Sequence, residues 1–401
     1  MEPFKRDYRH DFDLTDPELS ERWDDVVAAM HAGCPVARSE VGEGYWVVHN
    51  YKDVIQCSKD WRTFSSADGF MVNRPAGMPY FPPAEVDPPL QRALRAVLEP
   101  FLKPRAAAAF EPQVRAHANT LIDAFIANGE VELVSQFANP LPQYVFSTAV
   151  AGMDRQELPY LLNAFSFVGP ESERAQNFLH GMTRIERYMR QRQTETPRGD
   201  IVDALLTFEH EDFTWEDKVG TLCQLTIGGI GTTGYAFSGG LYHLATHAED
   251  RQRLVENPAL IPQALDEFLR LYRGVVNMAR RVKKEVEVGG VTMSAGDRVL
   301  LSYGAACRDP SLWKEPNKVD IDRRATAHLA FGAGVHRCIG ESLARVVLRF
   351  GYEEFLKRIP QFSVAADFVP EYETGSTRHM VRLPLHFAAA NARARHEGSP
   401  R

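Results

Sequence analysis

The sequence predicts a mainly α-helical protein with a minor β region. Apolar residues recur with helical spacing over long stretches from about Pro112 onward, whereas strand-like alternation is confined to short, clustered stretches. We found no internal repeat and no low-complexity linker in the 401 residues, 44% of which are hydrophobic, so the chain can bury a large core. We therefore expect one domain over residues 1–401, with an N-terminal arm at 1–25 and a frayed tail at 388–401.

Four helices can be placed with bounds. The longest is expected from Thr214 to His247, where Thr214 and Asp217 form an arrangement like a capping box. Helices end where glycine or proline interrupts the pattern, and they tolerate proline in the first turn. The other three cover 112–128, stopping before Gly129; 259–272, with Pro262 in its first turn; and 341–358, stopped by Pro360.

The strand signals are short. Residues 41–50 (VGEGYWVVHN) alternate, residues 282–304 predict two or three strands around Gly289 and Gly290, and residues 380–387 are a further candidate.

Composition excludes several classes. The formal net charge of −7 argues against a general nucleic-acid binder. No run of 18 apolar residues predicts a membrane span, and the N-terminus has no secretory h-region. Five cysteines without CxxC or zinc spacing fit free thiols in a reducing compartment. We therefore expect a cytoplasmic protein that binds neither nucleic acid nor membrane.

The strongest local signal is the segment from Phe331 to Arg345, FGAGVHRCIGESLAR. Glycines at 332, 334 and 340 surround Cys338, and a helix is expected directly after it. Glycine lets the backbone approach a flat ligand closely. Backbone N–H groups and a helix N-terminus stabilise a thiolate, which favours O–O cleavage when it is bound to haem iron. An isolated cysteine is more often an inert buried side chain, but this context favours a ligand.

The segment resembles the haem-binding loop of cytochrome P450, F-x-x-G-x-H-x-C-x-G. The resemblance implies a triangular, helix-rich body with the haem between the long oxygen (I) helix and the cysteine-loop (L) helix. It implies that Cys338 ligates the iron of heme b (iron protoporphyrin IX), that His336 reaches a propionate and that Phe331 packs near the sulfur. It further places Gly332 and Gly340 beside the cofactor.

Other motifs follow the family's order along the chain. Glu267 and Arg270, three apart on one helix face, resemble the E-x-x-R element beneath the haem, with Arg323 as the third partner; alone, such a pair would be a weak surface contact. Gln91 and Arg95 resemble the start of the family's C helix, where Arg95 would pair with a propionate. Arg280 is the second propionate candidate, and the adjacent Arg281 is the competing register.

The segment Gly228–Gly234 resembles the family's oxygen-binding motif [AG]-G-x-[DE]-T-[TS] and assigns catalytic positions to Gly228, Gly229 and Thr232. A local bulge or kink at these glycines would make room for dioxygen and water. Gly231 occupies the place of the usual acid, which normally relays protons. Either water fills this space and Thr232 still donates, or the chemistry is atypical, such as radical coupling, nitration or peroxide-driven oxidation.

Two rival interpretations use the same helix. Gly229, Gly231 and Gly234 also fit the dinucleotide fingerprint G-x-G-x-x-G, but that fingerprint needs a preceding strand and a βαβ unit. His243 and His247 have metal-compatible spacing, but no third ligand is evident, so we interpret them as histidines at a helix C-terminus.

The resemblance implies a monooxygenase of the soluble bacterial type, acting in secondary metabolism. It would insert one oxygen atom of O2 into a small or medium apolar organic substrate such as a terpenoid or an aromatic. The chain shows no flavin or nicotinamide domain, so electrons would come from a ferredoxin or flavodoxin and its reductase, docking on a basic patch that includes Arg92 and Arg337. The expected substrate contacts are Tyr80, Phe81, Ile227, Ile230, Thr233, Val275, Val276, Asn277, Ser376 and Thr377.

Overall fold

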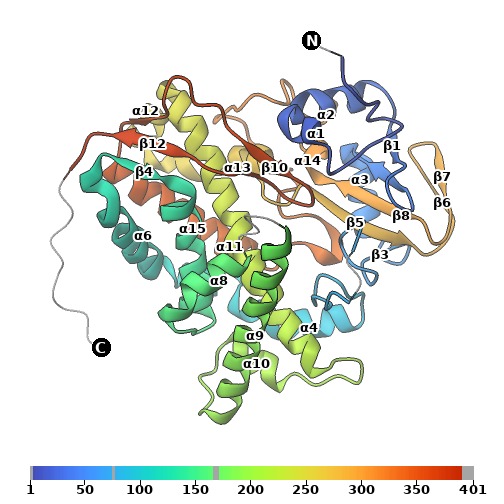
Figure 1. Cartoon of the computed structure of the whole chain (residues 1–401), viewed down its shortest axis with the longest axis horizontal. Coiled ribbons are helices and arrows are strands. Elements are labelled where there is room, and N and C mark those ends of the chain that lie inside the picture. Colours follow the sequence, from blue (N-terminus) through green and yellow to red (C-terminus); the bar gives the residue numbers. More distant parts are fainter. Residues whose placement is uncertain (1–2, 75–76, 166–170, 391–401) are drawn as a thin grey trace.

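Helices make up most of the chain, and a smaller β region lies to one side of them (Figure 1). The structure is a computed structural model, and it describes residues 3–74, 77–165 and 171–390. In Figure 1 the outline narrows toward α9 and α10. The mainly α architecture with a minor β region is the one predicted. The helices are α1 Pro17–Glu21, α2 Trp23–Ala32, α3 Tyr51–Lys59, α4 Leu90–Leu98, α5 Pro104–Ala108, α6 Glu111–Phe125, α7 Pro140–Gln143, α8 Leu158–Phe165, α9 Glu171–Thr194, α10 Ile201–Thr207, α11 Trp215–Thr246, α12 Ala248–Glu256, α13 Ile261–Tyr272, α14 Tyr303–Ala306 and α15 Glu341–Arg358.

Helix α11 crosses the whole helical body and has 32 residues. Its start is the predicted capping box: the Thr214 side chain accepts from the Asp217 N–H, and the Asp217 carboxylate accepts from the Thr214 N–H. It packs against α7, α13 and α15. The predicted bulge at its glycines does not form, because the segment is α-helical without interruption from Trp215 to Thr246. Open space lies beside Gly228, where an added Cβ would meet nothing within 4 Å.

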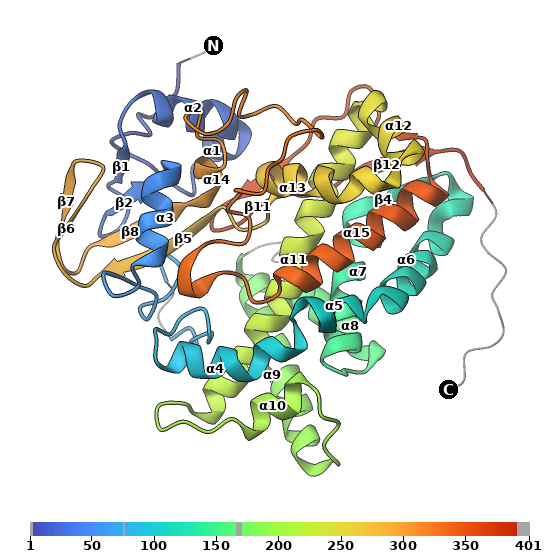
Figure 2. The same ribbon diagram turned by 180° about the vertical axis from the view of Figure 1, so that it is seen from behind.

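The other helix predictions agree with the structure to within a few residues. Helix α6 gives way to a short 3₁₀ turn before Gly129, whose φ of 74° ends it in the left-handed region. Helix α13 begins after the 3₁₀ turn Pro258–Leu260. Helix α15 has the predicted bounds and lies alongside α6 in the view from behind (Figure 2).

The largest sheet has five strands in the order β1-β2-β8-β5-β3. Strand β2 runs parallel to β8, with Val48 opposite Leu301, and the other neighbours are antiparallel. This sheet joins the first 65 residues to the segment after α13. The strands are β1 Val36–Ser39, β2 Tyr45–Val48, β3 Phe64–Ser65, β4 Glu130–Glu132, β5 Asn277–Val282, β6 Val286–Val288, β7 Val291–Met293, β8 Arg298–Ser302, β9 Phe362–Ser363, β10 Tyr372–Thr374, β11 Arg378–Met380 and β12 Pro384–Phe387.

The strand predictions were too long where glycine intervenes. Of residues 41–50 only β2 is a strand, because Gly42 and Gly44 adopt positive φ in the turn before it. The β6–β7 hairpin turns at Gly289 and Gly290, as predicted. Residues 380–387 divide between β11 and β12, which belong to different sheets.

Both chain ends contact the rest of the molecule over their described residues. In the described part of the N-terminal segment, Tyr8, Phe12, Leu19 and Trp23 are buried in a cluster with the sheet residue Leu300. At the other end, the Ala390 N–H donates to the Ile126 carbonyl, and residues 391–401 lie outside the described residues.

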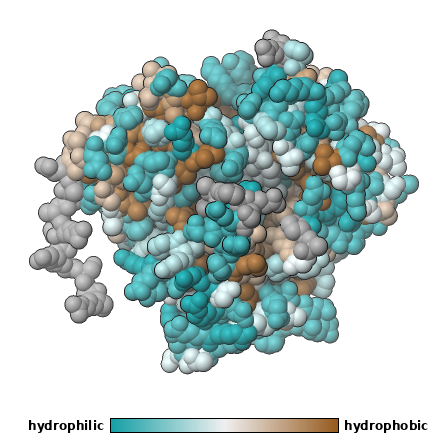
Figure 3. All heavy atoms as spheres, in the orientation of Figure 1, coloured by the Kyte–Doolittle hydropathy of each residue, from teal (hydrophilic) through white to brown (hydrophobic). Residues whose placement is uncertain are grey.

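The surface in Figure 3 is mostly hydrophilic over the lower lobe of α9 and α10, and apolar residues gather nearer its centre. Among the described residues, no helix combines the length and the apolarity that crossing a membrane requires.

Candidate functional site

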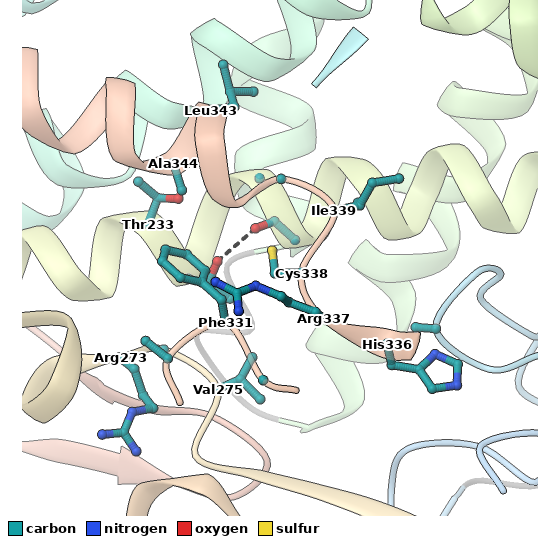
Figure 4. A pocket seen from close by; sticks show the side chains of 18 of the residues that line it. Thr233, Arg273, Val275, Phe331, His336, Arg337, Cys338, Ile339, Leu343 and Ala344 are labelled. Atoms are coloured by element: carbon teal, nitrogen blue, oxygen red, sulfur yellow. Dashed lines mark hydrogen bonds between the residues drawn. The ribbon is translucent and has the colours of Figure 1, made fainter. Parts of the chain in front are cut away.

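A large cavity lies between α11 and the loop that leads into α15 (Figure 4). Its space unfilled by protein atoms is about 1520 Å³, part of it open to solvent. One wall is formed by α11, and the opposite wall by the loop carrying Cys338 and the first turns of α15. The lining residues are Pro83, Ala84, Arg95, Leu102, Pro142, Phe146, Gln224, Leu225, Gly228, Gly229, Thr232, Thr233, Leu269, Arg273, Gly274, Val275, Met278, Arg280, Tyr303, Leu329, Ala330, Phe331, Gly332, His336, Arg337, Cys338, Ile339, Gly340, Leu343, Ala344, Val347 and Leu348.

The Cys338 side chain is exposed, and it faces the interior of this cavity. Its backbone N–H donates to the Phe331 carbonyl at 2.8 Å, which closes the loop. Burial raises the pKa of the Cys338 thiol, and the Gly340 N–H lowers that pKa. Since α15 begins at Glu341, its positive N-terminus also faces the sulfur and favours the thiolate.

Glycines shape the loop for a flat ligand. Gly332 has a φ of 67°, and a Cβ placed on it would meet nothing within 4 Å. Gly334 has a φ of 71°, and a Cβ there would collide with the Ser58 carbonyl, so only glycine fits. A Cβ on Gly340 would lie 4.0 Å from the Cys338 sulfur.

Three basic side chains line the same cavity. The His336 Nε2 is buried without a hydrogen-bond partner and lies 3.9 Å from the Asp87 carboxylate. Arg95 donates to the Arg337 carbonyl at 2.8 Å and pairs with Glu99. Arg280 is 3% exposed, and its guanidinium donates to the Ala279 carbonyl at 2.7 Å.

The structure distinguishes Arg280 from Arg281 as the candidate for the second propionate contact. Because successive residues of a strand face opposite sides, Arg281 on β5 turns away from the cavity and pairs with Asp68 at 3.2 Å. Gln91 does not line the cavity: its side-chain amide donates to the Val335 carbonyl at 2.6 Å and so supports the loop from outside.

Glu267, Arg270 and Arg323 meet in a buried cluster. Both Glu267 and Arg270 are fully buried, and their closest N–O distance is 2.7 Å. Arg323 Nε lies 3.1 Å from the same carboxylate. Arg270 also donates to the carbonyls of Cys307 and Pro316, which ties α13 to the segment that precedes the cysteine loop.

On the α11 wall, Gly228, Gly229 and Thr232 line the cavity. A Cβ on Gly228 would meet nothing within 4 Å, so the helix surface is open there. Thr232 Oγ1 donates to the Gly228 carbonyl at 2.7 Å. Gly231 does not line the cavity, and a Cβ on it would lie 3.0 Å from the Tyr235 hydroxyl.

These features fit a haem. The open spaces at Gly228 and Gly332 lie on opposing walls, where a planar ring would fill them. The unpartnered His336 nitrogen and the buried Arg280 are suited to the two propionate carboxylates of a haem. The cysteine sulfur that faces the cavity would supply a thiolate ligand to the haem iron.

Sequence comparison agrees with this geometry. The family model described as Cytochrome P450 matches residues 158–365. The chain belongs to the cytochrome P450 family. It is therefore a P450 monooxygenase, and its cofactor is a haem with a thiolate ligand.

Several relatives of this P450 are monooxygenases by name. A steroid C26-monooxygenase of Mycobacterium tuberculosis is 29% identical over 84% of this chain and 92% of its own length. A linalool 8-monooxygenase of Pseudomonas putida is 27% identical over 88% of this chain and 93% of its own length. Among solved structures, the bottromycin biosynthetic protein SalCYP is 28% identical with a TM-score of 0.81, covering 93% of this chain and 99% of that one.

Two of the ten predicted substrate contacts, Thr233 and Val275, line the P450 cavity, and eight do not. Helical phase explains two of these: Leu225, Gly228, Gly229, Thr232 and Thr233 share one face of α11, whereas Ile227 and Ile230 point elsewhere. Strand alternation turns Val276 into the core cluster of Trp23.

The remaining pocket predictions also miss the cavity. Asn277 donates to the Gly375 carbonyl at 2.8 Å. The Ser376 carbonyl accepts from Val276 and Asn277, and Thr377 bridges to Val275, so both support this wall through their backbone. Phe81 is buried in the main core, and Tyr80 lies exposed beneath Arg74.

Sequence reasoning missed several lining residues. Leu225 could have been found by stepping back seven residues from Thr232, because i and i+7 share a helix face. Met278 lies two residues before Arg280 on β5 and shares its face. Pro83, Ala84 and Phe146 come from segments with no motif, and only the tertiary fold brings them here.

The rival interpretations do not fit. Helix, not strand, precedes Gly229, so the dinucleotide context is absent from this described segment. A Cβ on Gly234 would collide with Asn139, which explains that glycine by packing. The His243 Nε2 lies 2.7 Å from Asp250, and among the described residues no group of three His, Cys, Asp or Glu side chains could hold a metal ion.

Proposed function

We propose that this P450 inserts one oxygen atom of O2 into a small or medium apolar organic substrate, with electrons from a separate ferredoxin or flavodoxin system. The observation that carries the proposal is a cysteine sulfur exposed inside an enclosed cavity, opposite the glycines and threonine of α11. Cys338 is the axial ligand of heme b. Arg95, Arg280 and His336 hold the propionates, and Phe331, Gly332 and Gly340 border the ring.

The chain's own residues prepare the site for this chemistry. A bound haem thiolate activates dioxygen for O–O cleavage. Gly228 leaves space between α11 and the cofactor, and Gly229 lets Phe146 approach the helix backbone. Thr232 donates its hydroxyl hydrogen to the Gly228 carbonyl, so its oxygen can accept a hydrogen bond and orient a proton-carrying water within the cavity.

The cavity lining supports an apolar substrate. Leu225, Phe146, Val275 and Met278 contribute apolar side chains near the α11 wall. Related proteins are named for terpenoid and steroid oxidation, which fits a compound of this class. We expect hydrogen-bond donors from Gln224 and Thr233 to orient it.

The proposed electron donor follows from the positive charge on the surface near the cysteine loop. Arg337 and Arg92 are exposed on the side of the cysteine loop and α4, and Arg337 pairs with Glu341 at 2.8 Å. A small acidic ferredoxin would find complementary charges at this face.

Absorption of the dithionite-reduced protein under carbon monoxide tests the cofactor assignment. We expect a strongly red-shifted Soret band, because thiolate donates electron density to the iron. Cys338→Ser should lose this band, whereas Cys57→Ser, which removes a buried thiol outside the cavity, should keep it. Retention of the band by Cys338→Ser would refute the assignment.

The substrate class is tested with a panel of terpenoids, fatty acids and polar sugars added to the ferric protein. A shift from low to high spin with apolar members alone supports the proposal. A response confined to polar members would contradict it.

A second candidate is an atypical reaction of the same haem site, such as radical coupling, nitration or peroxide-driven oxidation, because Gly231 replaces the usual acid. Gly231→Asp, which requires the Tyr235 hydroxyl 3.0 Å from the new Cβ to move aside, distinguishes the two. More product per NADH with the same product supports hydroxylation with a weakened relay, whereas a changed product supports the atypical reaction.

A further inference from the structure

The phenol group of Tyr235 occupies the space beside Gly231. A Cβ on Gly231 would lie 3.0 Å from the Tyr235 hydroxyl oxygen and 3.1 Å from its Cζ. Tyr235 is four residues later on α11, and helical side chains lean toward the N-terminus, so its ring reaches back over Gly231. The missing side chain is therefore what lets the hydroxyl lie against the helix one residue from Thr232.

The Tyr235 ring is held in this place. Tyr235 is 6% exposed and stacks on His379, with ring centroids 4.3 Å apart and planes 16° apart. On another side, a Cβ on Gly274 would lie 2.6 Å from Thr232 Cα and 3.0 Å from Tyr235 Cδ2. The backbone at Gly274 thus packs on both residues and leaves the phenol little freedom to move.

Behind the phenol, polar groups extend toward the surface. Neither ring nitrogen of His379 has a hydrogen-bond partner, and Nε2 lies 3.7 Å from the carboxylate of Glu373, which is 47% exposed. A small cavity lined by Tyr235, His379, Tyr372 and Arg378 adjoins them. The cavity has both polar and apolar walls and room for about one water, which would bridge these groups.

The protonation states suit transfer. Burial, together with Glu373, raises the pKa of Tyr235 to about 12, so its hydroxyl remains a donor. Burial and the nearby Arg378 lower the pKa of His379 to about 4, so the neutral ring can accept a proton on one nitrogen and donate from the other. The Thr232 hydroxyl donates its hydrogen to the Gly228 carbonyl, so its oxygen can accept a hydrogen bond.

We propose that the Tyr235 hydroxyl replaces the missing side chain at position 231 and donates protons toward Thr232, with resupply through His379. As the O–H proton of Tyr235 passes to water beside Thr232, its oxygen takes up in the same step a solvent proton relayed by water past Glu373 and His379, so that no buried phenolate remains. Only O–H and N–H bonds are made and broken, and the tyrosine is regenerated. Tyr235 is thus a positioning residue that acts through Thr232. The inference rests on the proposed O2-dependent oxidation at this site.

The test uses the holoenzyme with carbon monoxide as probe. In the reduced protein, we expect Tyr235→Phe to shift the infrared C–O stretch and to abolish its sensitivity to D2O, since Phe keeps the ring and removes the donor. Tyr242→Phe, a hydroxyl lost two turns later on α11, should match wild type. An unchanged C–O band in Tyr235→Phe overturns the inference. This measurement needs no turnover, so it stays informative if the proposed oxidation fails.

A double variant tests the replacement itself. With the compound giving the largest spin shift, Tyr235→Phe should release at least threefold more hydrogen peroxide per NADH. Gly231→Asp added to Tyr235→Phe should restore the wild-type value, because loss of the hydroxyl removes the 3.0 Å contact and the ring, with Cζ at 3.1 Å, then has to shift by only a few tenths of an ångström to admit the new side chain. Wild-type peroxide release by Tyr235→Phe, or no recovery in the double variant, overturns the relay.

Discussion

At the residue scale, the fully buried carboxylate of Glu267 accepts four hydrogen bonds. It accepts two hydrogen bonds from Arg270 at 2.7 Å, one from Arg323 at 3.1 Å and one from the Asp320 N–H at 3.1 Å. A buried charge is tolerated only with such compensation.

We therefore expect Glu267→Gln to destabilise the protein by about 3–5 kcal/mol, because it leaves the buried Arg270 without its counter-ion. Urea unfolding followed by circular dichroism measures this. Arg253→Gln, which breaks an exposed, solvent-screened pair with Asp322, is the control and should leave the stability nearly unchanged. Equal effects of the two variants would contradict the buried cluster's role.

Also at this scale, the sequence predicted the cavity residues that belong to a local motif. It predicted less well the residues whose side-chain orientation decides whether they reach the cavity. Cys338, His336, Arg95 and Arg280 all line the cavity, as do the glycines 332 and 340. Ile227, Ile230 and Val276 were chosen by proximity to a motif, and neighbouring positions on a helix or strand face different ways. Side chains such as Phe146 depend on tertiary packing that no local pattern encodes.

At the element scale, α11 meets its neighbours through glycines. A Cβ on Gly234 would collide with Asn139 Oδ1 and lie 2.9 Å from the Ala138 carbonyl, so the π-helical turn Val134–Ala138 packs directly on the α11 backbone. The sequence predicted the helix and its cap from Thr214 and Asp217 but not this packing, since glycine also suggests a kink.

Gly234→Ala should thus destabilise the protein by about 1–3 kcal/mol, although alanine favours a helix by about 1 kcal/mol over glycine. Chemical unfolding of the holoenzyme measures the change. Ser238→Ala, one turn later, removes a hydroxyl that donates to the Gly234 carbonyl and should cost about 1 kcal/mol or less. A stabilised Gly234→Ala variant would show that the contact is not tight.

Ion pairs and a hydrogen bond connect helices α6 and α15. Arg115 on α6 binds Glu353 and Glu354 of α15, and Asn119 donates to Glu354 at 2.8 Å. Burial raises the pKa of Glu354, but hydrogen bonds from Asn119 and Arg115 outweigh it, and the pKa lies below its ordinary value of 4.5.

Because the pKa of Glu354 is depressed in the folded state, its ionised carboxylate stabilises the fold fully above pH 4.5. This stabilisation is lost as the pH falls through the lower folded-state pKa. Glu354→Gln should therefore be less stable than wild type near pH 7, by about 1–2 kcal/mol, with the difference shrinking below pH 4.5. Melting temperatures from pH 7 to pH 3 measure it. Glu111→Gln, altering an exposed partner of Arg115, should show a smaller difference; a pH-independent deficit in Glu354→Gln would argue against the ion pair.

At the scale of the whole molecule, the P450 core is built around the cavity between α11 and the cysteine loop. Apolar walls from α11 and α15 lack partner atoms until a ligand fills the space, and a ligand that binds only the folded state stabilises it.

We expect the haem-depleted protein to melt at a lower temperature than the holoenzyme. Free haem at about 100 times its Kd should restore about 2.7 kcal/mol of stability. Far-ultraviolet circular dichroism of both forms measures the difference. Identical melting curves would mean that the cavity is not where the haem binds.

The parallel pairing of β2 with β8 has a consequence for biosynthesis. Val48 finds its partner at Leu301, about 250 residues later in translation. At about 5–20 residues per second, the ribosome needs roughly 12 to 50 seconds to deliver that partner. Until then the nascent hairpin of β1 and β2 carries an unpaired, largely apolar edge, which makes this early segment the part of the chain that chaperones must shield.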